Sequence, residues 1–563
     1  MPRERRFLKP RPLRALVPAP PGETEPAESQ PPKPRSEDPI PKDLAEVRRR
    51  LKAGAGGSTD VIIREFEAGR EKVRLLLVYV DGLVNKDIID QHIIAPIIRA
   101  GRYGRKTGAP VDLSSPEELG RRVLTSGQIK IVDRFHRSEM DFCAGNTVLF
   151  IDGADRALSL DTRGWEKRGI DHPETERSTR ASREGFVETL QTNLALIRRR
   201  IKDPSLRVEA TTVGRRTHTT VAIVWLEGLT NPVLVETVRK RLKAIQVDRV
   251  IESYVIEYYL KDDPWTPFPL IRGTERPDFS ARELLDGRVL ILVEGSPFGL
   301  IAPATIADFY RTMDDYVHNY MTVSMTRLVR FVANFLVIFF AAGYVALIDM
   351  HPELIPTDLA ISIAGSREGV AFPGIIEVVL MLLVFEILHE ATLRLPGMMG
   401  PTIGVVGGLV IGQAAVQAKI ISDVMVIIIA MQAIAIFTPP SLEMSLTWRV
   451  LLWGSVLFAG VFGIFGLVLY SIILTAHVSG LTSLGVPFTA PNAPPSPIGQ
   501  RDNFIRAAFK RLRRRPEYIH PRDDVRRQPY AQPAEHPPLS GGFDGERPNG
   551  ADGRPNDGGE ANR

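Results

Sequence analysis

Long apolar runs between Leu328 and Ser479 constrain the fold of this chain more than any other feature. Leu, Ile, Val, Phe, Ala and Gly dominate this section, whereas the chain before about residue 320 is mixed in charge and the chain after Pro487 is rich in Pro, Gly and Arg. A helix that crosses a bilayer needs about 20 predominantly apolar residues. We therefore predict a polytopic α-helical transmembrane domain at 328–480, with four to six spans.

The number of spans depends on the lengths of these runs and on the charges beside them. The clear apolar segments lie at 328–348, 374–396, 402–418, 424–437 and 448–474. Basic residues flank the section on both sides, at Arg327, Arg330, Arg511, Arg513, Arg514 and Arg515. Basic flanks favour the cytoplasmic side, so an even number of spans is expected. Either one segment is re-entrant, or the short run "LAISIAG" at 359–365 adds a sixth.

Four glycines recur at every fourth position of one apolar segment, at Gly400, Gly404, Gly408 and Gly412. Each glycine weakens a helix by about 1 kcal/mol relative to alanine. In lipid, small residues at this spacing let helices pack closely, so the stripe predicts a helix-packing face. Other faces carry candidate pore-lining residues, namely Ile403, Val406, Val410, Gln413 and Gln417. A ring of valines could gate a pore by dewetting. The alternative is an ordinary buried helix of a single-chain bundle.

Ionisable residues within the predicted spans form a second candidate site: Glu377, Glu386, Glu390 and Arg394. Charged groups at membrane depth cost several kcal/mol, about 3, so they rarely face lipid. Glu390 and Arg394 are four residues apart and are expected to pair on one helix face. The group is either an ion-conducting or gating site, or a polar contact between helices or subunits.

The section before the membrane contains an internal repeat. "VYVDGLVNKDII" at 79–90 matches "VWLEGLTNPVLV" at 224–235, and a predicted hairpin at 146–162 resembles another at 287–303. Each pair predicts a strand, a turn and a helix, followed by a β-hairpin. We therefore predict an α+β protein with duplicated α/β subdomains at 59–175 and 209–305.

Connecting segments complete the predicted organisation. A periodic helix at 182–203 is expected to join the subdomains within a linker at 176–208. A juxtamembrane helix at 306–327 is expected to carry Tyr310, Tyr316 and Tyr320 into an interfacial aromatic belt. The tails at 1–58 and 481–563 are basic and proline-rich, and we expect both to be disordered apart from a short helix at "LAEVRRRLKA".

Acidic–glycine pairs end four of the predicted strands, at Asp81, Asp152, Glu227 and Glu294. Such pairs are typical of turns, although these carboxylates could also bind a ligand or catalyse a reaction. The chain has one cysteine, Cys143, which excludes an intrachain disulfide and a cysteine metal cluster. Phosphate-loop, nucleophile-elbow and HExxH motifs are absent from the sequence. We predict no catalytic residue, metal site or cofactor, and no nucleic-acid partner.

Several stretches, in order along 60–495, resemble the A subunit of the GerA family of spore germination receptors. They include "SREGFVETLQTNLALIRRRI", "TVGRRTHTTVAIVWLEGLTNP", "SREGVAFPGIIEVVLMLLVFEILHEATLRLP", "IGVVGGLVIGQAAVQA" and "GVPFTAPNAP". The resemblance implies a multi-pass protein of the spore inner membrane, with its soluble domain on the cytoplasmic (core) side. It also implies assembly with a transporter-like B subunit and a lipoprotein C subunit in a complex that senses nutrients and triggers germination.

On the same resemblance, the A subunit is expected to be a homo-oligomer that conducts monovalent cations and contacts membrane lipid. A paralogous branch, the stage V sporulation AF-type protein, is similar and could conduct ions without a nutrient of its own. Two further interpretations remain: a non-conducting scaffold that anchors the B and C subunits, and a membrane-tethered enzyme. Alanine at Val406 or Val410 should make a channel leak but should only loosen a scaffold.

Overall fold

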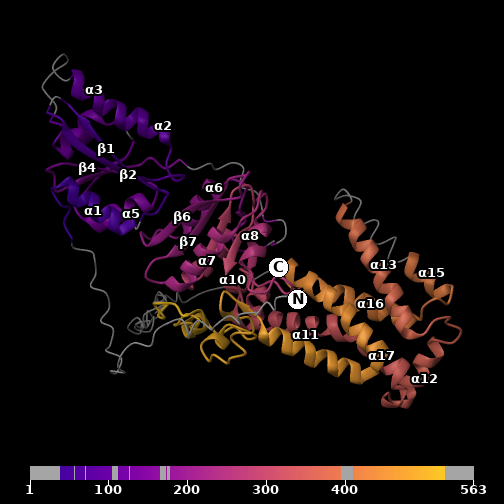
Figure 1. The fold of residues 1–563 in the computed structure, drawn as a ribbon. Coiled ribbons are helices and arrows are strands. Elements are labelled where there is room, and N and C mark those ends of the chain that lie inside the picture. The colour runs from indigo at the N-terminus through magenta and orange to yellow at the C-terminus, as the bar shows by residue number, and fades with distance from the viewer. Residues whose placement is uncertain are drawn as a thin grey trace, which may run out of the picture. The chain divides into compact units, whose positions relative to one another are not determined.

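A computed structural model describes residues 38–55, 57–69, 71–103, 112–125, 127–164, 173, 176, 178–394 and 410–526. All elements discussed below belong to one compact unit. Figure 1 shows two sheet-containing parts followed by a bundle of long helices. The candidate site lies in that bundle and at its junction with the second sheet.

The first sheet has the strand order β1-β2-β4-β5-β3, and all neighbouring strands are antiparallel. Its strands are β1 (Val61–Ala68), β2 (Val73–Val80), β3 (Ile129–Val132), β4 (Thr147–Ile151) and β5 (Ala157–Leu160). One face packs on helices that lie between β2 and β3 in the sequence: α2 (Lys86–Ile88), η3 (Ile89–Ile94), α3 (Ala95–Tyr103), α4 (Pro116–Glu118) and η4 (Leu119–Val123). The other face packs on α1 (Leu44–Ala55) and α5 (Phe135–Cys143). Because both faces are covered, β2 is apolar at nearly every position instead of alternating.

The second sheet repeats this arrangement with the order β6-β7-β9-β10-β8, again antiparallel. Its strands are β6 (Leu206–Val213), β7 (Thr219–Leu226), β8 (Arg272–Thr274), β9 (Val289–Val293) and β10 (Gly299–Ala302). One face packs on α6 (Leu190–Arg200) and α9 (Pro277–Leu285), and the other on α7 (Pro232–Ala244) and α8 (Ser253–Leu260). The matching strand orders agree with the repeat that the sequence predicts.

Turn chemistry explains why the acidic–glycine pairs recur. Gly82, Gly153, Gly228 and Gly295 all have φ between 81° and 86°, a left-handed conformation that glycine adopts without strain. Asn85 and Asn231 then cap the helices that follow the first turn of each copy. The four glycines therefore make turns at strand ends, as the turn interpretation expects. The Asp152 and Glu294 carboxylates also accept hydrogen bonds from the remote N–H groups of Leu44 and Leu190.

The predicted linker helix at 182–203 is shorter than expected. Helix α6 begins only at Leu190, whose backbone N–H donates to the Glu294 carboxylate over 3.1 Å. The preceding residues form neither helix nor strand, and the Phe186 N–H donates to the Glu275 carbonyl at 2.7 Å. The helix is therefore a layer of the second sheet's core and not a free connection.

The helical bundle contains α11 (Tyr320–Val345), which continues as η6 (Ala346–Met350), then η7 (Pro352–Leu354), α12 (Thr357–Ser366) and α13 (Gly374–Arg394). After the gap come α15 (Gly412–Gln417), α16 (Asp423–Ile436) and α17 (Leu442–Gly480). Among the described residues, two helices are long and apolar enough to cross a membrane, Tyr320–Met350 and Leu442–Gly480.

Helix α17 corrects the prediction of one last span at 448–474. Gly463 has φ 61° and ψ −140°, which breaks the helix into two arms. The arms pack against each other, because the Tyr470 hydroxyl donates to the Leu451 carbonyl at 2.6 Å and the rings of Phe458 and Tyr470 lie 5.4 Å apart. The segment is therefore a helical hairpin. By contrast, "LAISIAG" lies in α12, whose ten residues rise about 15 Å, about half of a bilayer core.

The predicted juxtamembrane helix at 306–327 is also broken. Its residues form a 3₁₀ turn, η5 (Ile306–Tyr310), a short helix, α10 (Asp314–Val317), and the first turns of α11. A capping box at Thr305 and Asp308 starts the 3₁₀ turn. The aromatic-belt prediction is wrong for two tyrosines: Tyr310 accepts a hydrogen bond from Trp448 Nε1 at 2.7 Å, and the Tyr316 hydroxyl donates to Asp502 at 2.6 Å.

Residues 481–526 are folded, although the sequence placed them in a disordered tail. They form a two-stranded sheet, β11 (Thr482–Ser483) and β12 (Val486–Pro487), and the 3₁₀ turns η9 (Gly499–Arg501), η10 (Phe509–Arg511) and η11 (Glu517–Ile519). Arg515 donates to the Leu285 carbonyl at 2.8 Å, and Arg526 pairs with Asp286. These contacts with Leu285 of α9 and with the residue after it hold the segment in place. Its polar composition alone would not give it a fixed structure.

Candidate functional site

The bundle has two ends, which we name by their contacts. At the proximal end, Phe268 of the second subdomain packs on Trp448 at 5.9 Å between ring centroids, and Thr266 lies 2.9 Å from His477 Nε2. At the distal end, a Cβ built on Gly463 would lie 2.7 Å from His351 Nε2. Both open ends of the α17 hairpin are therefore proximal, and its turn is distal.

The described part of the Gly-rich segment has two unlike faces. Gly412 is buried, and a Cβ added there would meet Val426 of α16 at 3.9 Å. Val410, Gln413 and Gln417 are exposed, Val410 by 56%. The remaining predicted residues lie outside the described residues: Gly400, Ile403, Gly404, Val406 and Gly408. Where it is described, the helix packs through its glycine and leaves the predicted pore-lining side without cover.

Glu377 occupies the distal end and is fully buried. Arg367 Nη2 lies 3.1 Å from its carboxylate, and the Ser422 N–H donates to it at 2.8 Å. Asp349 shares the same arginine at 3.1 Å and also accepts from the N–H groups of Gly374 and Ile375. The carboxylates therefore fasten the start of α13 to the end of α11. A buried pair of this kind is costly to break, because the remaining charge would be left without compensation.

Glu386 lies at the proximal end and pairs with Arg449 of α17, whose Nε is 3.2 Å from the carboxylate. Glu390 also has an interacting partner, whereas the side chain of Arg394 lies outside the described residues. Glu377 and Glu386 thus pair with different arginines, Arg367 and Arg449, and do not form one cluster. Sequence reasoning missed Arg449, although an arginine at the start of the last apolar run was a usable signal.

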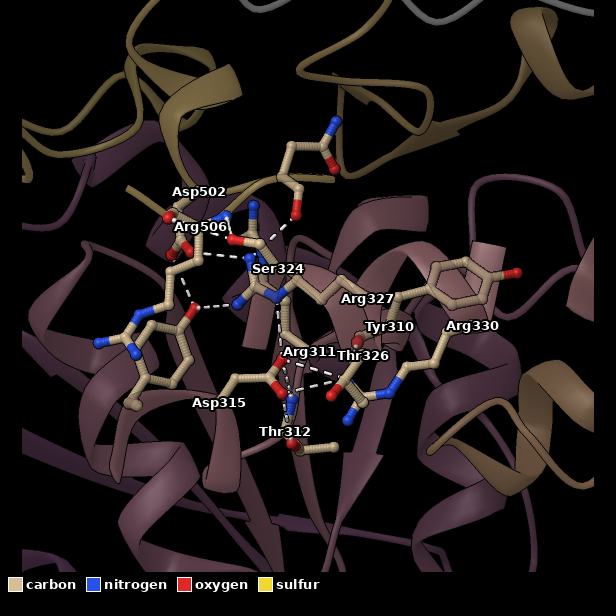
Figure 2. A network of polar contacts seen from close by, with 12 residues as sticks. Tyr310, Arg311, Thr312, Asp315, Ser324, Thr326, Arg327, Arg330, Asp502 and Arg506 are labelled. Atoms are coloured by element: carbon tan, nitrogen blue, oxygen red, sulfur yellow. Dashed lines mark hydrogen bonds and ion pairs between the residues drawn. The ribbon is translucent and has the colours of Figure 1, made fainter. Parts of the chain in front are cut away.

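A buried polar network joins the second subdomain, α11 and the C-terminal segment (Figure 2). Arg327 Nε lies 3.0 Å from Asp315, and its Nη1 lies 2.9 Å from Asp502. Arg330 also contacts Asp315, at 3.1 Å, and donates to the Tyr310 carbonyl at 2.9 Å. The two arginines that the sequence analysis used as orientation signals are therefore also structural ion pairs.

The electrostatics of this junction favour charged carboxylates. Burial alone would raise the pKa of the Asp502 carboxyl, but Arg311, Arg327 and Arg282 outweigh it and lower the pKa well below its usual range. Asp308 behaves in the same way beside Arg288 and Arg311, which lie 2.6 and 3.1 Å away. Burial raises the pKa of the Tyr316 hydroxyl to about 12, so this hydroxyl keeps its proton and donates to Asp502.

The ion pairs of the junction hold elements of the fold together. Among the described residues, no cluster of histidine, cysteine, aspartate or glutamate could hold a metal ion. The carboxylates at the junction are saturated by arginines, which leaves them little capacity to act as general bases. An apolar cavity of about 260 Å³ lies beside the network, lined by residues that include Asn334, Phe331, Phe335, Trp448 and Phe504.

Comparison with known proteins identifies the class to which this chain of two sheets and a helical bundle belongs. The family model "Bacillus/Clostridium GerA spore germination protein" matches residues 49–518. Spore germination protein KA of Bacillus subtilis is 37% identical over 86% of this chain and 88% of its own length. Spore germination protein GerLA of Bacillus cereus is 37% identical over 86% of this chain and 96% of its own length. The chain therefore belongs to the GerA family of spore germination proteins.

Two further similar proteins are a sporulation protein and a domain of known structure. Stage V sporulation protein AF of Bacillus subtilis is 29% identical over 84% of this chain and 94% of its own length. A crystal structure of the N-terminal domain of the A subunit of the Bacillus megaterium spore germinant receptor GerK3 matches 48% of this chain and 98% of its own, with 32% identity and a TM-score of 0.38.

Proposed function

We propose that this chain is a membrane subunit of a nutrient-germinant receptor complex in the spore inner membrane, where it triggers germination. Its membership of the GerA family supports the role in germination. The identity of 37% to germination proteins, against 29% to the stage V sporulation protein, favours a receptor subunit over the sporulation paralogue. The partners in this proposal are a transporter-like B subunit and a lipoprotein C subunit.

The proposal includes an even number of membrane crossings, which keeps the soluble subdomains and the C-terminal segment on the cytoplasmic (core) side. Helices α11, α13 and α16 and the two arms of α17 each run between the proximal and distal ends. The Gly-rich segment, whose described end is Val410–Gln417, is the sixth crossing of the proposal. The hairpin at Gly463 thus supplies the extra crossing that the charges on both flanks require.

We further propose that copies of this chain assemble around the Gly-rich helix and form a channel for monovalent cations. The observation that carries this step is the division of that helix into a buried Gly412 side and an exposed side with Val410, Gln413 and Gln417. Valines would narrow and dewet the closed passage, and the glutamine amides would replace part of the ions' hydration shell. Ile403 and Val406 continue the proposed lining.

The test is cation flux through the full chain in proteoliposomes. Val410→Ala should raise basal potassium or sodium efflux several-fold, because a smaller side chain removes the apolar constriction. Ile427→Ala is the matched control, since Ile427 is also an exposed aliphatic residue, on α16, but lies outside the proposed lining. Gln417→Cys should in addition become sensitive to a charged, water-soluble thiol reagent.

A non-conducting scaffold predicts different results. Val410→Ala would then change assembly or stability without altering flux, and Gln417→Cys would give no reagent-dependent block. Equal leakage from Val410→Ala and Ile427→Ala would also contradict a channel lined by this face. The buried Cys143, whose pKa is raised to about 12 by burial, should contribute little background labelling.

A further inference from the structure

A basic and apolar segment lies at the base of α11, and we name residues 501–515 the strap. We propose that the strap is an in-plane membrane anchor that binds the surface of a bilayer containing anionic phospholipids. Its apolar side chains Phe504, Ile505 and Phe509 enter the boundary between headgroups and acyl chains, while its exposed basic side chains contact lipid phosphates. The inference rests on the part of the proposed function in which α11 crosses the membrane.

Buried contacts hold the strap against the first turns of α11. Asp502 accepts from Arg327 at 2.9 Å, and the Arg506 N–H donates to Ser324 Oγ at 3.1 Å. Arg506 Nη1 also donates to the His318 carbonyl at 2.9 Å. Figure 2 shows Asp502 and Arg506 beside Ser324 and Arg327. The strap is therefore a fixed part of the junction.

The strap lies where α11 changes from polar to apolar. The ring of Phe504 packs edge-on against Phe331, with 4.9 Å between centroids. Phe331 directly follows Arg330, the last basic residue of the helix, and Leu328, Phe331 and Phe335 are all more than half exposed. If α11 spans the bilayer, this level is the membrane surface, because basic residues stay near headgroups while aliphatic and aromatic residues continue into the acyl region.

Exposure and charge on the strap point to a lipid surface. Ile505 is 71% exposed and Phe509 is 56% exposed. Exposed apolar residues rimmed by charges are typical of interaction surfaces. The exposed basic residues are Arg501, Lys510, Arg511, Arg513 and Arg514, whereas the strap's sole acidic residue, Asp502, is buried. Apolar side chains combined with an excess of Arg and Lys are the signature of interfacial binding to anionic lipid.

The depth of the strap can be measured in the full chain reconstituted into nanodiscs. Ile505→Cys and Phe509→Cys would be labelled with an environment-sensitive fluorophore, then quenched by lipids that carry a shallow spin label or by aqueous iodide. Phe335→Cys on α11 is the lipid-exposed control, and Ile131→Cys, at a 47% exposed residue of β3 in the first subdomain, is the water-exposed control. We expect labels at 505 and 509 to be quenched by lipid at least threefold more than the label at 131.

Three other outcomes would contradict the proposal, and each would have a different explanation. If iodide quenches positions 505 and 509 as strongly as position 131, the strap faces water. If neither quencher reaches them, another protein or a second copy of the chain covers the strap. If position 335 is also inaccessible to lipid, α11 does not cross the membrane, and the proposed function fails together with the anchor.

The dependence of quenching on lipid charge tests the proposed contact between the basic side chains of the strap and lipid phosphates. The triple variant Arg511→Gln, Arg513→Gln, Arg514→Gln should reduce lipid quenching at position 505 at least twofold in nanodiscs that contain phosphatidylglycerol. It should change little in phosphatidylcholine alone, because the attraction depends on anionic headgroups. A matched control replaces Arg121, Arg122 and Lys130, exposed basic residues of the first subdomain. Equal losses in both lipids would show that the arginines hold the strap to the protein and not to the membrane.

Discussion

The two sheets share one topology but differ in where they place charge. Lys130 of β3 pairs with Ser159, and Arg272 of β8 pairs with Ile301, at the same register position of each copy. Lys130 is exposed, whereas Arg272 is 2% exposed. The cation on the edge strand of the first sheet is therefore solvated. The equivalent cation on the edge strand of the second sheet is buried.

The neighbours of Arg272 explain this difference. Arg272 donates to the backbone carbonyls of Asp308 and Arg311, pairs with Glu176 at 3.1 Å, and stacks on Phe279 with its guanidinium 3.9 Å from the ring centroid. Asp308 and Arg311 belong to the segment that leads into α11. Duplication therefore preserved the sheet, while the second copy acquired the buried charges that fasten it to the helical bundle.

The largest expected difference between the two sheets comes from truncating the two equivalent cations. Arg272→Ala should destabilise the second sheet by about 3–5 kcal/mol, because its buried carboxylate and carbonyl partners lose their donors. Lys130→Ala should change the first sheet by less than about 0.5 kcal/mol, as is usual for exposed positions. Hydrogen exchange of peptides that contain β10 and β5 measures the two effects separately in the full chain.

The expected loss corresponds to about a hundredfold or greater increase in exchange of β10 for Arg272→Ala. Exchange of β5 should stay unchanged in that variant. Similar small effects at both positions would mean that Arg272 is well solvated in solution, and the contrast between the two edges would disappear.

Acid is expected to lower the stability of the second copy more than that of the first, but by less than the Arg272 truncation does. The folded pKa of Asp502 lies below its unfolded value of about 3.9, so its stabilisation is present above about pH 4 and is lost as the pH falls toward the folded value. The melting temperature of the wild-type chain should therefore fall between about pH 5 and pH 3. Asp502→Asn should melt lower at neutral pH but with a flatter dependence over that range.

Asp161 of the first copy is the control for this measurement. Its pKa is also lowered, chiefly by a hydrogen bond from Arg163, but the two side chains remain 31% and 46% exposed. Such a surface pair contributes little because solvent screens it. Asp161→Asn should leave the acid dependence nearly unchanged, and an equal flattening in both variants would contradict a special role for the junction.

Periodic patterns and turn residues predicted much of the fold from the sequence. Alternation and apolar runs located β2, β4, β7 and β9, and the repeat predicted that both sheets share a plan. The break in the helix at Gly463 was not predicted, because apolar residues continue on both sides of it. Its signal was length: the predicted run at 448–474 would extend about 40 Å as one helix, about 10 Å more than the bilayer core.

The buried charges could not be predicted from the sequence. Arginine is mostly an exposed residue, so no sequence signal marked Arg272 and Arg288 as buried, and Arg327 served only as an orientation signal. Some of their acidic partners are remote in sequence: Glu176 lies 96 residues from Arg272, and Asp502 lies 175 residues from Arg327. Only tertiary structure brings such pairs together. Helical spacing, by contrast, placed Val410, Gln413 and Gln417 away from the glycine stripe, and these residues are exposed. Their pore-lining role stays a prediction.

The smallest expected effect concerns the turns that both copies share. Gly153 and Gly295 follow the acidic residues Asp152 and Glu294 and have φ of 84° and 86°. A Cβ at Gly153 would meet nothing within 4 Å, and one at Gly295 would only touch the Ile251 carbonyl at 3.9 Å. Conformational strain alone should therefore decide the cost, and alanine at either position should destabilise its own sheet by about 1–2 kcal/mol.

Gly127→Ala provides the control, because Gly127 is described without a positive φ and has open space around it. This change should be neutral or slightly stabilising, by up to about 1 kcal/mol. Hydrogen exchange of the β4–β5 and β9–β10 hairpins reports the costs for the two copies. Equal costs would mean that the copies diverged at their edges while their turns stayed under the same backbone constraint. A much larger loss at Gly295 would instead tie this turn to α6, since Glu294 accepts the first N–H of that helix.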